Sequence, residues 1–153
     1  MPFISTAGKT PPVDFQTALF QGLAPDGGLY LPESRVPFTS SQIATLHGES
    51  LLHTASVIGR HLVGEHVGSE AAARVFRHAL DFSIPLVPLE DRLFILELFH
   101  GPTAAFKDVA ARVMARLMSL LHDPTGGILT VLAATSGDTG GAVAHAFHGI
   151  QGT

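Results

Sequence analysis

The sequence predicts an α/β fold, in which a mostly helical N-terminal domain with short strands precedes the first βαβα units of an incomplete parallel sheet. Three observations indicate this fold. The opening, to residue 38, is rich in Pro and Gly; a helical pattern runs from 41 to about 82; and the order strand, loop, helix then occurs twice. We therefore expect two domains, 1–83 and 84–153.

The N-terminal domain contains both extended and helical patterns. Residues 3–13 and 22–38 are typical of short extended pieces joined by turns. Between them, residues 13–22 predict a short helix with Asp14 as its cap and Gly22 as its stop. Apolar residues then recur at helical spacing in two stretches, for which Ser50 and Ser69 are the expected N-caps.

The second domain begins after Pro85 and Pro88. Residues 92–99 (RLFILELF) predict a buried strand, because they form a short run of aromatic and branched apolar side chains. Ala105 to His122 predicts a helix with Arg112 and Arg116 on its outer side.

A second unit of the same kind follows. Residues 127–134 (GILTVLAA) predict a second buried strand, SGDTGG a loop, and Ala142 to His148 the start of a further helix. Two parallel strands with one layer of helices cannot bury such a sheet, so we expect the chain to end inside a domain.

Composition excludes several classes of function. The chain has 153 residues, with 9 Lys+Arg against 13 Asp+Glu and a formal net charge of -4, which gives no basic field for nucleic acid or a membrane surface. No apolar run is long enough to span a bilayer, so we expect a cytoplasmic protein. The absence of cysteine excludes disulfides and thiolate metal sites, and the nine histidines are scattered, so we expect no metal.

Two loops follow the predicted strands, where ligands bind in open α/β sheets. In the second loop, Gly137 and Gly140 let the backbone approach a ligand, while Ser136 and Thr139 add hydroxyl donors. This combination suits a carboxylate or a phosphate. The alternative is a tight turn in which a Ser or Thr side chain caps the helix.

The first loop leads to Lys107, one of only two lysines in the chain; the other is Lys9. Apolar neighbours at a positive helix end favour the uncharged amine that a Schiff-base lysine requires. The alternative is an exposed lysine on the solvent face of the helix, paired with Asp108 or with another neighbour.

Four stretches together resemble the N-terminal part of threonine synthases: 3–33, the helical run to 82, LELFHGPTAAFKD at 96–108 and AATSGDTGGAV at 133–143. The resemblance implies a tryptophan-synthase-beta-like domain of fold type II. It also implies pyridoxal 5'-phosphate (PLP) as cofactor and the conversion of O-phospho-L-homoserine and water to L-threonine and phosphate. One departure is Ala7, where the family usually has arginine.

The resemblance also assigns roles to residues. Lys107 is implied as the catalytic residue that holds PLP covalently, and Asp138, where related enzymes usually have Asn, as a second cofactor-binding residue. Substrate binding is implied for Thr103, Ser136, Gly137, Thr139 and Gly140.

Two alternatives remain open. Threonine synthases are several hundred residues long, so this chain matches their N-terminal portion, without the later glycine-rich loop for the cofactor's phosphate. It could instead be a non-catalytic remnant or interaction module that self-associates through an incomplete sheet. It could also be a related PLP-dependent lyase for another phospho-amino acid.

Overall fold

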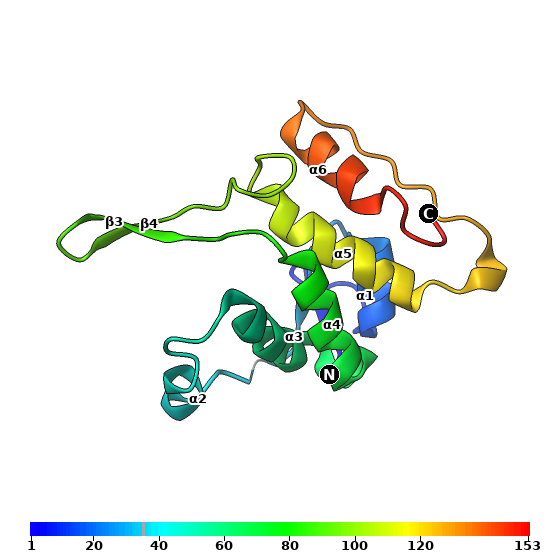
Figure 1. The fold of residues 1–153 in the computed structure, drawn as a ribbon. Coiled ribbons are helices and arrows are strands. Elements are labelled where there is room, and N and C mark those ends of the chain that lie inside the picture. Colours follow the sequence, from blue (N-terminus) through cyan, green and yellow to red (C-terminus); the bar gives the residue numbers. More distant parts are fainter. Residues whose placement is uncertain (35) are drawn as a thin grey trace.

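A computed structural model of the chain describes residues 1–34 and 36–153 (Figure 1). Arg35, inside the stretch predicted to be extended, lies outside the described residues. The elements of the described part are, in chain order, β1 (Phe3–Ser5), α1 (Phe15–Gln21), β2 (Tyr30–Pro32), α2 (Ser40–Ala44), α3 (Leu51–Val67), α4 (Ser69–Ala79), β3 (Leu86–Glu90), β4 (Leu93–Leu96), α5 (Lys107–Leu121), the 3-10 helix η1 (Pro124–Gly126) and α6 (Asp138–Phe147). None of the described helices is long and apolar enough to cross a membrane.

A small antiparallel sheet of β1 and β2 organises the N-terminal segment. The Asp26 carboxylate fixes the turns beside it: it accepts hydrogen bonds from Ser5 Oγ at 2.6 Å and from the N–H groups of Lys9 and Thr10, each at 2.9 Å. These bonds, above all the one from Ser5, favour the charged carboxylate and hold the pKa of Asp26 well below its usual range.

The helix boundaries of this domain agree with most of the predicted caps. Asp14 accepts a hydrogen bond from the Thr17 N–H at the start of α1, and Gly22 ends that helix, as predicted. Ser50 caps α3 through the His53 N–H, also as predicted. Ser69 as an N-cap was wrong, because the cap position is Gly68 and Ser69 is already the first helical residue.

Helices α3 and α4 pack side by side, and α5 crosses against α4 (Figure 1). The main hydrophobic core joins buried residues of α3 and α4, such as Ala55 and Phe76, with Leu117 of α5. The core thus extends across the predicted boundary at 83/84, and the two-domain division stays a prediction.

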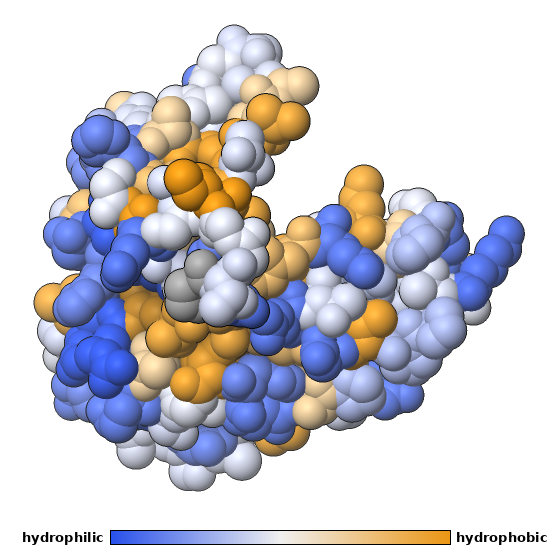
Figure 2. All heavy atoms as spheres, turned by 90° about the vertical axis from the view of Figure 1, so that its right-hand side faces the viewer, coloured by the Kyte–Doolittle hydropathy of each residue, from blue (hydrophilic) through white to orange (hydrophobic). Residues whose placement is uncertain are grey.

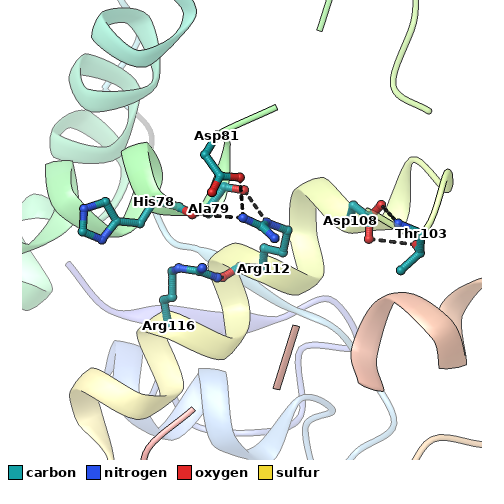
Figure 3. A network of polar contacts seen from close by, with 7 residues as sticks. All are labelled: His78, Ala79, Asp81, Thr103, Asp108, Arg112 and Arg116. Carbon is teal, nitrogen blue, oxygen red and sulfur yellow. Dashed lines mark hydrogen bonds and ion pairs between the residues drawn. The ribbon is translucent and has the colours of Figure 1, made fainter. Parts of the chain in front are cut away.

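Arg112 corrects the predicted outer face of α5: only 7% of this residue is exposed. Its Nε donates to the Ala79 carbonyl at 2.7 Å, and its Nη2 donates to the His78 carbonyl at 3.2 Å and pairs with Asp81 (Figure 3). The last carbonyls of a helix have no partners within the helix. The Arg112 guanidinium therefore caps α4, a role that helical periodicity does not reveal.

The prediction of two buried parallel strands was also wrong for the described residues. Residues 86–96 form an antiparallel hairpin, β3 with β4, whose side chains are all exposed. Residues 127–134 form no strand; Leu132 there is 90% exposed. The apolar pattern of residues 92–99 and 127–134 indicates strands that are buried by packing against other elements. Within the described residues, no element buries these two segments.

The hairpin projects away from the helices in Figure 1. On the face drawn in Figure 2, hydrophobic side chains reach the surface in several patches. A two-stranded hairpin is only marginally stable in water by itself. A further surface that covered this apolar hairpin would therefore stabilise it. Its exposed large side chains are Leu86, Val87, Leu89, Leu93, Phe94, Ile95 and Leu96.

Candidate functional site

A cavity of about 410 Å³ lies between the N-terminal parts of α5 and α6. Its walls are mostly apolar, and its two polar side chains, Lys107 and Thr139, come from the first turns of these helices. The remaining lining residues are Leu98, Phe106, Val109, Ala110, Ala111, Met114 and Val143. The structure thus brings together one residue from each of the two predicted ligand loops.

Small side chains allow α5 and α6 to approach each other. Ala111 and Ala115 of α5 are buried against Ala142 and Ala146 of α6 in a second hydrophobic cluster. Because helix separation depends on the side chains at the contact, alanines on both sides bring the two helix starts close together.

Lys107 is the first residue of α5 and is half-buried. Its Nζ lies 4.2 Å from the centroid of the Phe106 ring, a cation–π distance. Among the ion pairs of the described residues, none involves Lys107, so the alternative pairing with Asp108 is not formed. The amine therefore faces aromatic and apolar surface without a carboxylate partner.

Asp108 instead anchors the loop before α5. Its side chain is fully buried: Oδ2 accepts from the Thr103 N–H at 2.9 Å and Oδ1 from Thr103 Oγ1 at 2.8 Å (Figure 3). A Cβ at Gly101 would lie only 2.5 Å from Asp108 Oδ2, so this close approach requires glycine. Buried charges need such partners, and this one fixes the chain immediately before Lys107.

Thr135 anchors the second loop in a similar way. Its Oγ1 accepts from the N–H groups of Gly137 and Gly140, each at 3.1 Å. A Cβ at Gly140 would lie 2.3 Å from Thr135 Cγ2, so the contact again depends on glycine. The helix consequently starts at Asp138, inside the predicted SGDTGG loop, and not at Ala142.

The capping by Thr135 leaves other donors available at the start of α6. The N–H groups of Asp138 and Thr139 have no acceptor among the described residues. Unpaired N–H groups at a helix start carry partial positive charge and suit an anion.

The other predicted site residues do not line this cavity. Ser136, Gly137 and Asp138 are exposed beside it, Gly140 packs on Thr135, and Thr103 donates to Asp108. Their predicted contacts with cofactor or substrate stay predictions. Sequence reasoning missed Asp108 and Thr135 as loop anchors, although an acidic residue in a first helical turn and a threonine before a glycine-rich turn are both recognisable signals.

Solved structures share this fold. The chain superposes on the X-ray crystal structure of PLP-bound threonine synthase from Brucella melitensis with a TM-score of 0.91 and 42% identity, which covers 100% of this chain and 34% of that one. For threonine synthase from Escherichia coli the TM-score is 0.87, with 34% identity over 99% of this chain and 35% of that one. This chain thus belongs to the class of partial homologues of a PLP-dependent lyase.

The sequence comparisons name the family. The family model described as threonine synthase N terminus matches residues 2–80, and the chain belongs to this family. It is 36% identical to threonine synthase from Methylobacillus glycogenes and 39% identical to that from Pseudomonas aeruginosa; these matches cover 99% and 93% of this chain. They cover only 35% and 31% of the relatives, so the chain spans about a third of their length.

Thr135 and Ser136 give a test of the second loop. Thr135→Val removes the acceptor for two N–H groups and should lower the free energy of unfolding by about 1 kcal/mol, the usual effect of losing a helix cap. Ser136→Ala, at an exposed neighbouring hydroxyl, is the matched control and should change it by less than about 0.5 kcal/mol. Urea denaturation measures both; equal effects of the two substitutions would contradict this assignment.

Proposed function

We propose that this chain provides the lysine-bearing N-terminal third of a PLP-dependent threonine synthase, which converts O-phospho-L-homoserine and water to L-threonine and phosphate. The observation that carries the proposal is the position of Lys107: an amine without a carboxylate partner, in an apolar cavity that also contains Thr139 at the start of α6. The match of the whole chain to PLP-bound threonine synthase supports it.

The residues of the cavity suit PLP. An aromatic aldehyde needs a primary amine and apolar walls, and the cavity offers Lys107 beside Phe106 together with Val109, Met114 and Val143. PLP, when bound, supplies an electron sink for reactions at the amino-acid substrate.

The chain's own residues would then act as follows. Lys107 Nζ would hold the cofactor covalently, and as a free amine it would accept and return protons at the substrate. The free N–H groups of Asp138 and Thr139, at the positive end of α6, bind the substrate carboxylate. Thr135 and Asp108 act through the loops they fix, so they are positioning residues.

The proposed activity needs more polypeptide than this chain contains, because the chain spans about a third of the relatives. The exposed apolar side chains of the β3–β4 hairpin and of Ile128 and Leu132 offer a surface for the other two thirds. Burial of such side chains removes apolar area from water and stabilises the joined structure.

Covalent trapping of PLP tests the role of Lys107. The chain is incubated with PLP and reduced with borohydride, and the labelled peptide is identified by mass spectrometry. We expect the label on the peptide with Lys107 in the native sequence and in Lys9→Ala, and its loss in Lys107→Ala. Because the chain has only these two lysines, Lys9→Ala is a matched control. Equal labelling of Lys9 and Lys107 would refute the assignment.

A second candidate function rests on the hairpin itself. Its exposed strand edges and apolar faces are of the kind that pair with another copy of the chain, which favours an interaction module. If the chain is such an interaction module, we expect sedimentation to show concentration-dependent dimers. The substitution Ile95→Lys should abolish these dimers, whereas Arg92→Lys in the turn should leave them intact. A monomer at all concentrations would exclude it without affecting the role of Lys107.

A further inference from the structure

A second cavity, of about 250 Å³, lies between α4 and α5 and shares no lining residue with the Lys107 cavity. Its lining contains three basic or titratable side chains, Arg74, His78 and Arg116, and no carboxylate. The other lining residues are Ala71, Val75, Ser119 and Leu120. Positive charge therefore gathers around a small hollow.

Arg116 is the half-buried member of this group. Its Nη1 donates to the Arg112 carbonyl at 3.1 Å, which is one use among the five N–H donors of a guanidinium. Burial, and then the nearby Arg112 guanidinium, lowers the pKa of Arg116, while Asp81 acts in the opposite direction. The charge of Arg116 is thus poorly compensated where it lies.

The acidic side chains near the cavity are already engaged. Asp81 pairs with Arg112, and Glu70, on the same helix as Arg74, pairs with Arg60 at 2.7 Å. Neither Arg74 nor Arg116 forms an ion pair within the described ranges 1–34 and 36–153. Ser119 donates its hydroxyl proton to the Gln151 carbonyl, so the free donors are those of Arg74, His78 and Arg116.

We propose that this cavity binds a small phosphate-type anion, either inorganic phosphate or the phosphate group of a monoester. Guanidinium groups match phosphate oxygens with parallel, charge-assisted hydrogen bonds, and two arginines face this hollow. A volume of about 250 Å³ accommodates such a group, and no lining carboxylate repels it.

The competing explanation is that these basic residues only complement the negative ends of α4 and α5. Arg112 already covers the last carbonyls of α4, and Arg74 lies in the middle of that helix. Complementing the helix ends therefore does not account for Arg74, whose charge, after those of Arg60 and Arg77, also helps to lower the pKa of Glu70 one turn earlier.

An NMR titration of the arginine side-chain N–H groups tests the site. Inorganic phosphate is added at constant ionic strength, maintained with chloride. We expect the Arg74 and Arg116 signals to shift saturably, and the Arg92 signal, whose side chain is 92% exposed in the hairpin turn, to stay in place. Parallel, non-saturating shifts of Arg74, Arg116 and Arg92 would show general ion binding only and overturn the proposal.

Variants make the test specific. Arg74→Gln, on the exposed side of α4, should weaken phosphate binding at least ~5-fold because it removes a charge-assisted contact. Arg92→Gln is the matched control and should leave the affinity unchanged, as should Lys107→Ala, which separates this site from the proposed PLP site. An unchanged affinity in Arg74→Gln would overturn the proposal.

Repeating the titration with O-phospho-L-serine distinguishes the two sources: tighter binding than that of phosphate indicates a monoester, and weaker binding indicates the free ion.

Discussion

The buried carboxylate of Asp108 is the constraint on which the site depends. A fully buried charge is costly unless it is hydrogen-bonded, and both oxygens of Asp108 are satisfied by Thr103. This requirement draws the loop from Gly101 back onto the first turn of α5, and Ala104 adopts a left-handed φ of 56° within it. Lys107 is consequently held at the start of α5.

Helix α5 connects the loop fixed by Asp108 to the rest of the molecule. Arg112 joins it to the end of α4, and Ala111 and Ala115 let α6 approach its other side. The same helix thus borders both of these cavities, the apolar one lined by Lys107 and the cationic one lined by Arg116. The β3–β4 hairpin contributes little to this framework, because its side chains are exposed in the described structure.

Local signals were predictable from the sequence, whereas features that depend on distant partners were not. The caps Asp14 and Ser50 follow from contacts within one helical turn. A strand forms at Leu93–Leu96, inside the predicted 92–99, but it is exposed and antiparallel, because burial requires neighbours that the described residues do not supply. Arg112 is buried because it meets carbonyls more than thirty residues away, which periodicity along α5 cannot indicate. In the site, Lys107 and Thr139 were predicted from motif resemblance, and they line one cavity. Their roles there stay predictions.

Hydrogen exchange at the Thr103 amide tests the central constraint most directly. If the N–H of Thr103 donates to Asp108, its exchange should be roughly 100-fold slower than that of an exposed loop amide, and Thr103→Val should raise exchange along 101–106 by loosening the loop. Ser136→Ala should leave this protection intact. Exchange of the Thr103 amide at the rate of an unstructured peptide would contradict the account, because Asp108 would then not fix the position of Lys107.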